Sequence, residues 1–131
     1  MSKTDTPMDF SKYLLSPTGR VEINLPNGDP MLYEGQRVAV NVYSPASREY
    51  AKAEAELQRT ATSRLMGKKI GDDNDEADAR FLVAITESIE NFPYPGGIGA
   101  VYRDRGLIYI GQQVRAYVGE QGNFFAKSGT S

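Results

Sequence analysis

One segment near the C-terminus, LIYIGQQVRAYVGEQGNFF over residues 107–125, most constrains how this chain folds. Its apolar side chains recur with the period of an α-helix, so a helix places them in one stripe. The stripe consists of Leu107, Ile110, Val114, Tyr117 and Val118. Gly119 and Gly122 predict the end of this helix, because glycine readily adopts the left-handed conformation that closes one. Phe124 and Phe125 follow, and two interpretations stay open: helix and aromatic tail pack on the domain's own core, or they bind a partner.

Two earlier segments, residues 21–25 and 38–42, alternate apolar and polar side chains. This period of two is typical of strands with one buried face. The sequence PNGD at residues 26–29 predicts a turn, since Asn-Gly tolerates the positive φ angles of tight turns. We therefore expect an N-terminal antiparallel β-hairpin, with residues 31–33 pairing briefly beside it.

A long helix is predicted to follow the hairpin. Ser44 suits its N-cap and Pro45 its first position. The next residues are rich in alanine and in long polar side chains that favour helices, so we expect about 22 helical residues, or roughly 33 Å. One face of this helix carries small side chains, at Ala46, Ala53 and Ala61. A stripe of this kind allows close packing against a neighbouring helix or a second copy of the chain.

A second helix is predicted over residues 79–92, ARFLVAITESIENF, which have the widest apolar face in the chain. Pro93 and Pro95 end it, and residues 100–102 form a short helical turn before the terminal helix. The predicted fold class is therefore α+β: an N-terminal antiparallel β-hairpin followed by three principal α-helices, mostly helical.

The length of 131 residues fits one domain. We expect a flexible N-terminal arm over residues 1–19, a single domain over residues 20–125 and a disordered tail over residues 126–131. The N-terminus lacks the apolar stretch of a signal peptide, and no apolar run approaches the roughly 18 to 20 residues of a membrane span. We therefore expect a cytoplasmic protein without a membrane partner.

The chain contains neither cysteine nor histidine. Disulfides and thiolate metal sites are therefore excluded, and enzymatic chemistry loses its usual nucleophile and its usual near-neutral base. Its 15 basic and 17 acidic residues give a net charge of −2, which argues against a nucleic-acid surface. We expect no catalytic, cofactor-binding or metal-binding residues, and no nucleic-acid partner.

The acidic run DDNDEAD at residues 72–78 is the one candidate for carboxylate chemistry. Counted from Asp72 it fails as a calcium loop, because Ala77 stands where glycine is required and Val83 where a bidentate glutamate is required. The run instead suits the positive end of a helix macrodipole. A carboxylate-dependent enzyme built on these acids is kept as a weaker alternative.

Three segments, taken in order, resemble the tail assembly chaperones of long-tailed (siphovirus-type) bacteriophages and prophages. The first is VAVNVYSPASREYAKAEAELQR, a strand leading into a helix. The second is ITESIENFPYPG at residues 85–96, whose Ile-Glu-Asn matches a Trp/Ile-Glu-Asn signature. The third, residues 100–125, matches a pattern of Gln-Val, an apolar pair and Asn-Phe-Phe. The chain departs from the family at Ile89, where tryptophan is usual, and at Gly111, where a residue that favours helices more is usual.

The resemblance implies a binding function without enzymatic chemistry. Members of this family bind the tape-measure protein and tail-tube subunits in the host bacterial cytoplasm, self-associate as homo-oligomers and are absent from the finished virion. The amphipathic terminal helix and its aromatic tail can exchange packing within the chain for a partner's groove. The candidate partner-binding residues are Tyr102, Leu107, Ile110, Val114, Tyr117, Phe124 and Phe125. The alternative is a permanent structural tail protein of the virion, such as a tube or tail-completion component.

Overall fold

The computed structural model describes residues 13–65 and 74–125. The predicted C-terminal tail, most of the predicted N-terminal arm and the start of the acidic run lie outside these residues. The elements in chain order are β1 (Thr18–Glu22), β2 (Leu32–Tyr33), β3 (Gln36–Arg37), β4 (Ala39–Tyr43), α2 (Arg48–Leu65), α3 (Asn74–Ile85), β5 (Thr86–Glu90), α4 (Gly97–Arg103), the 3-10 helix η2 (Arg105–Leu107), α5 (Ile108–Val118) and the 3-10 helix η3 (Gln121–Phe124). The predicted α+β class is confirmed for the part of the chain that the structure describes.

The main sheet has three antiparallel strands in the order β1-β4-β5. Val21 of β1 lies opposite Val40 of β4, and Val40 also lies opposite Ile89 of β5. The predicted pairing of the two alternating segments is therefore present, but β1 and β4 do not form a simple hairpin. The chain between them forms a second, two-stranded sheet from β2 and β3, and β5 adds a third strand on the far side of β4.

The predicted helix over residues 79–92 is wrong in its second half. Helix α3 ends at Ile85, and the next five residues form β5 at the open edge of β4. The Thr86 hydroxyl donates to the carbonyl of Leu82 at 2.7 Å, at the point where the helix ends. The apolar residues of this segment have the spacing of a helix. Its backbone hydrogen bonds are instead made with β4, which lies more than forty positions earlier in the sequence. Tertiary contacts thus override the local pattern.

The predicted start of the long helix is three residues too early. The backbone N–H of Tyr50 donates to Ser47 Oγ at 3.0 Å, so Ser47 is the N-cap and α2 begins at Arg48. Ser44 instead closes a preceding turn, where its Oγ accepts from the backbone N–H of Ala46 at 3.1 Å. The alanine stripe predicted for the long helix is only partly buried. Ala53 is buried, at 5% exposure, whereas Ala46 and Ala61 lie exposed.

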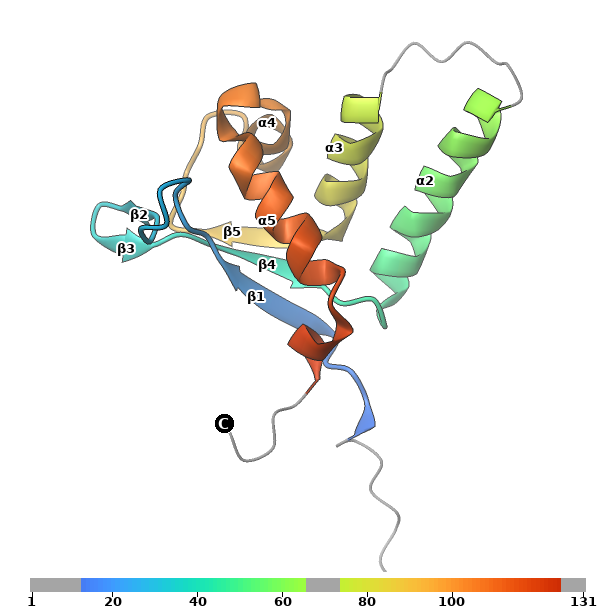
Figure 1. The fold of residues 1–131 in the computed structure, drawn as a ribbon, viewed down its shortest axis with the longest axis horizontal. Helices are drawn as coiled ribbons and strands as arrows, with labels where there is room; N and C mark the ends of the chain where they lie inside the picture. The colour runs from blue at the N-terminus through green and yellow to red at the C-terminus, as the bar shows by residue number, and fades with distance from the viewer. Residues whose placement is uncertain (1–12, 66–73, 126–131) are drawn as a thin grey trace, which may run out of the picture.

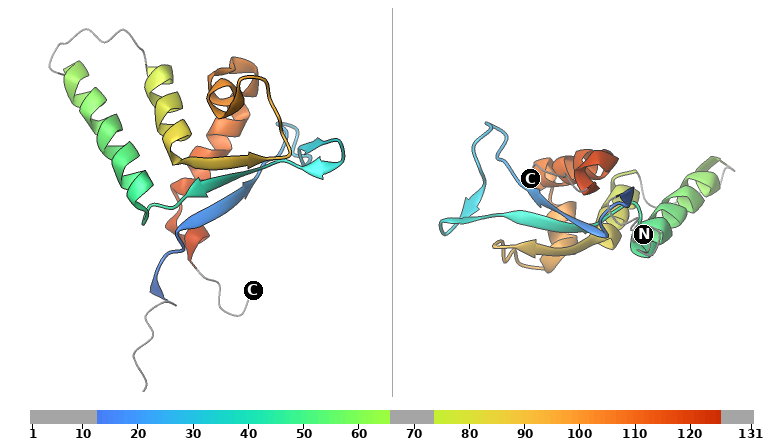
Figure 2. Two further views of the ribbon diagram at one scale, coloured as in Figure 1. Left: turned by 180° about the vertical axis from the view of Figure 1, so that it is seen from behind. Right: turned by 90° about the horizontal axis from the view of Figure 1, so that it is seen from below.

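The core lies between the sheet and three helices. Helix α5 crosses one face of the sheet beside α4 and α3, and α2 packs against α3 at the outside (Figure 1). Seen from behind, none of the helices within residues 13–65 and 74–125 covers the opposite face of the sheet (Figure 2). The largest fully buried apolar side chains come from the inner sheet face, from α3 to α5 and from η3; they are Ile23, Val38, Val40, Val42, Ile85, Val101, Ile110, Val114 and Phe124.

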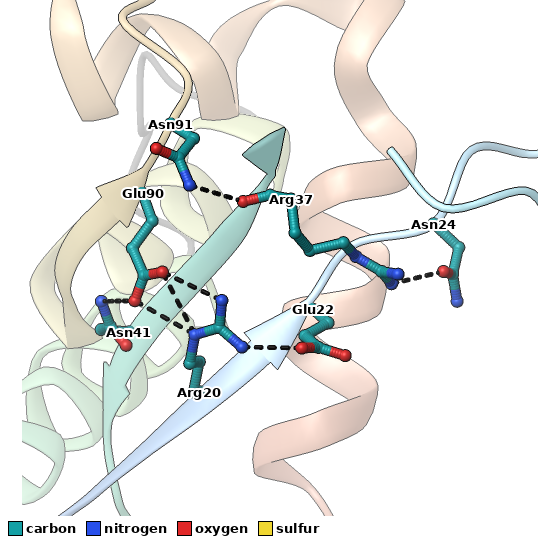
Figure 3. A network of polar contacts seen from close by, with 7 residues as sticks. All are labelled: Arg20, Glu22, Asn24, Arg37, Asn41, Glu90 and Asn91. Atoms are coloured by element: carbon teal, nitrogen blue, oxygen red, sulfur yellow. Dashed lines mark hydrogen bonds and ion pairs between the residues drawn. The ribbon is translucent and has the colours of Figure 1, made fainter. Parts of the chain in front are cut away.

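The open face of the sheet carries a polar network that joins all three strands (Figure 3). Arg20 of β1 donates to the Glu90 carboxylate of β5 at 3.0 to 3.2 Å and to Glu22 at 2.7 Å. Asn41 of β4, which lies between them, also donates to Glu90 at 2.9 Å. Glu90 therefore fixes β5 to both of the other strands.

The pH dependence of stability should report on this network. Hydrogen bonds from Arg20, and then from Asn41, hold the pKa of Glu90 below its ordinary value of 4.5. Such a carboxylate stabilises the fold above its unfolded pKa, and this contribution is lost as the pH falls through the lower folded pKa. We expect Glu90→Gln to lower stability modestly near neutral pH and to flatten the acid side of the stability profile in urea unfolding. The exposed Glu87→Gln is the control, and an unchanged profile for Glu90→Gln would contradict the assignment.

Candidate functional site

The two sides of α5 differ in what they contact. Ile110, Val114 and Val118 are buried on the side that faces the sheet, and the helix ends at Val118 with Gly119 as its C-cap. The buried stripe and the end of the helix at Gly119 agree with the sequence prediction. Gly119 has φ −76° and ψ −10°, however, so the left-handed conformation expected of this glycine is absent. The opposite side carries Ile108 and Ala116, and Ile108 is 45% exposed, although it is a large apolar residue.

That exposed side of α5 forms one wall of a groove of about 700 Å³, with α3 and the α4–η2 segment as the other walls. Its apolar lining consists of Leu82, Tyr102, Ile108, Gly111 and Ala116. Gly111 lets α5 approach its neighbours closely, because a Cβ at this position would lie 3.1 Å from Leu82 Cδ1. The glycine that departs from the family pattern thus has a packing role in the groove.

Ion pairs form the rim of the groove. Arg103 of α4 donates to the two carboxylate oxygens of Glu76 at 3.0 and 2.7 Å. Arg115 of α5 pairs with Asp78, and its guanidinium carbon lies 4.9 Å from the centre of the Phe81 ring. The hydrogen bond from Arg103 lowers the pKa of Glu76, so this carboxylate is charged at neutral pH. The pairs therefore tie α3 to both α4 and α5.

Two further polar contacts set the shape of the α4 end. Tyr94 donates its hydroxyl to Asp104, and the backbone N–H of Gly106 donates to the same carboxylate at 2.8 Å, so the pKa of Asp104 is lowered. The Tyr102 hydroxyl lies 2.7 Å from Thr86 Oγ1, and burial raises the pKa of Tyr102 to about 12. The Tyr102 phenol is therefore neutral at physiological pH. The hydroxyls of Tyr94 and Tyr102 are both hydrogen-bonded within the fold.

The sequence-predicted partner-binding residues fall into four groups in the structure. Tyr102 lines the groove. Ile110, Val114 and Phe124 are buried in the core, whereas Leu107 and Tyr117 are half-buried against it and Phe125 is 42% exposed. A role of these residues in binding a partner stays a prediction.

Sequence reasoning missed most of the residues that line the groove, among them Leu82, Ile108 and Gly111. They come from three elements that are separated along the chain, so no local pattern connects them. One signal was available: Ile108 is a large apolar residue that lies off the buried stripe of α5. A single apolar residue of this kind is common on protein surfaces, so only the neighbouring apolar residues that the structure brings beside it mark a contact surface.

Within residues 13–65 and 74–125, no group of three or more histidine, cysteine or acidic side chains is arranged to hold a metal ion. Among the helices that the structure describes, none is long and apolar enough to cross a membrane. Comparison with models of protein families, with curated proteins and with solved structures finds no match for this chain.

Proposed function

We propose that this protein is a non-enzymatic tail assembly chaperone of a long-tailed bacteriophage, which binds the tape-measure protein and tail-tube subunits in the host cytoplasm. The observation that carries the proposal is the open groove between α3, α4 and α5, with its apolar lining and charged rim. The resemblance of three ordered sequence segments to this family supports the same conclusion.

A groove of this composition suits an amphipathic helix as its ligand. The apolar face of such a helix would cover Ile108 and Ala116, and its polar flanks would meet the ion pairs of Arg103 and Arg115. Members of the family that this chain resembles accompany the long tape-measure protein, which has apolar helices, so that protein is the natural source of the bound helix. Binding there would keep the apolar helices of the tape-measure protein from aggregating while tail-tube subunits are recruited.

Replacing Ile108 with glutamate tests the proposal. Ile108 is 45% exposed in the free protein, so the variant should keep its melting temperature. A carboxylate buried against an apolar helix face is costly, and we expect affinity for the co-expressed tape-measure protein to fall at least about tenfold in a pull-down or titration. Leu14→Glu is the matched control, because Leu14 is 60% exposed and does not line the groove. Equal binding by the Ile108 variant and the wild type would rule out this groove as the binding site.

A permanent structural protein of the tail is the alternative, and it makes a different prediction about the virion. A chaperone leaves the assembly, whereas a tube or tail-completion protein stays in it. Mass spectrometry of purified phage particles therefore separates the two functions, and we expect this chain to be absent. Its presence at a fixed ratio to the tail-tube protein would overturn the chaperone proposal.

A further inference from the structure

A second pocket, of about 470 Å³, lies at the end of the main sheet, where the β2–β3 hairpin meets the segment that follows β5. The hairpin extends beyond the main sheet on the side away from α2 (Figure 1). None of the residues that line this pocket also lines the groove; they are Tyr33, Glu34, Gln36, Ile89, Asn91, Phe92 and Pro93. The proposed chaperone function does not use it.

Two aromatic rings lie in this pocket beside the apolar side chains of Ile89 and Pro93. Tyr33 and Phe92 meet edge to face, with ring centres 6.1 Å apart and planes at 88°. Phe92 also stacks on Tyr94 at 5.7 Å, and the Tyr94 hydroxyl is held by Asp104. Tyr33 is nevertheless 39% exposed, so a fixed aromatic surface is presented to solvent.

The same pocket contains both of the non-glycine residues with positive φ that the described part of the chain has. Glu34 has φ 51° and Asn91 has φ 60°. Asn91 tolerates this conformation, and its Nδ2 donates to the carbonyl of Arg37 at 2.8 Å. Glu34 and Gly35, at φ 80°, form the tight turn of the hairpin. Asparagine or glycine is preferred at such a position, so Glu34 adopts a backbone conformation that its residue type disfavours.

Among the described residues that line the pocket, Glu34 alone carries a charge. The side chain of the nearby Arg37 donates to Asn24 at 2.7 Å (Figure 3), and among the described residues it forms no ion pair with Glu34. The pocket thus offers aromatic faces, one carboxylate and the amide oxygens of Gln36 and Asn91. All of these are acceptors for a positively charged group.

We propose that this pocket binds an arginine side chain presented by a partner protein. Both basic side chains are attracted to an aromatic face, but the planar guanidinium can also stack on it and is less strongly hydrated than the lysine ammonium. Its fork of N–H donors matches a carboxylate and amide oxygens at once. The negative charge of Glu34 favours a basic side chain as the ligand. The aromatic rings favour arginine over lysine, because the guanidinium is planar.

The test is an NMR titration of the ¹⁵N-labelled full chain with Nα-acetyl-arginine amide. We expect saturable shifts of the Gln36 and Asn91 side-chain amides, with an affinity in the millimolar range for one small group. The citrulline analogue has the same shape without the charge and should give no saturable shift. Glu34→Gln should weaken binding about three- to fivefold, the effect of one exposed ion pair, whereas Glu87→Gln should leave it unchanged.

Three results would overturn the proposal. The first is no saturable shift at these amides with the arginine probe. The second is equal binding of citrulline, which would make the charge irrelevant. The third is equal or tighter binding of Nα-acetyl-lysine amide, which would remove the argument from planar geometry. The spectrum of Glu34→Gln away from the hairpin should match that of the wild type, so that a loss of binding reflects the missing carboxylate.

Discussion

Replacing Phe124 with alanine is expected to lower the free energy of unfolding by about 3 to 5 kcal/mol, the usual cost of truncating a buried aromatic residue. Phe124 is 2% exposed and belongs to the core cluster. Its ring meets Tyr117 edge to face, with centres 5.2 Å apart. Urea unfolding followed by circular dichroism measures the loss. A variant that unfolds at the wild-type urea concentration would show that Phe124 is not part of the core.

The neighbouring Phe125 is the matched control. It is 42% exposed, and its backbone forms a single β-bridge with Leu15 that an alanine would keep. We therefore expect Phe125→Ala to change stability by no more than about 0.5 kcal/mol. Sequence periodicity left open whether the aromatic tail is core or interface, and the structure separates the two residues. Partner-binding experiments are better based on Ile108, because replacing Phe124 would also destabilise the fold.

Local patterns predicted those elements whose burial follows from their own sequence. The alternation around Val21 and Val40 predicts β1 and β4, and the helical stripe through Ile110 and Val114 predicts α5. Strand β5 was missed because its apolar spacing continues that of α3, while its pairing partner lies far away in sequence. The groove was missed for the same reason, apart from Tyr102, since three separated elements form it.

The residues that carry the family resemblance have clear structural roles in this fold. Gln113 uses its side-chain amide to pair with both backbone groups of Asn24, accepting from the N–H and donating to the carbonyl at 2.8 Å each. Asn123 donates to the carbonyl of Tyr117 at 2.9 Å, which ties the segment after α5 to the last turn of that helix. Glu90 joins the three strands of the sheet. Because these side chains are used to build the fold, the groove and its exposed Ile108 are the better place to look for partner specificity.

The packing of Phe124 also explains a glycine in the middle of β1. A Cβ on Gly19 would lie 2.6 Å from Phe124 Cε1 and 2.9 Å from Tyr117 Cε1, closer than non-bonded atoms approach. Both rings must move to admit it. We expect Gly19→Ala to cost about 1 to 3 kcal/mol, as overpacking of a core does, although alanine is otherwise at least as favourable as glycine in a strand.

A double-mutant cycle identifies the cause of that loss. Phe124→Leu shortens the side chain that meets the new methyl group, so Gly19→Ala should cost clearly less in that background than in the wild type. Gly122→Ala is the control for glycine replacement in general, because nothing lies within 4 Å of its Cβ position. If the two losses simply add, the clash with Phe124 is not what selects glycine at position 19. A coupling of the expected sign would show that β1, α5 and the aromatic tail pack as one unit, and that Phe124 is held in the core by a strand from the other end of the chain.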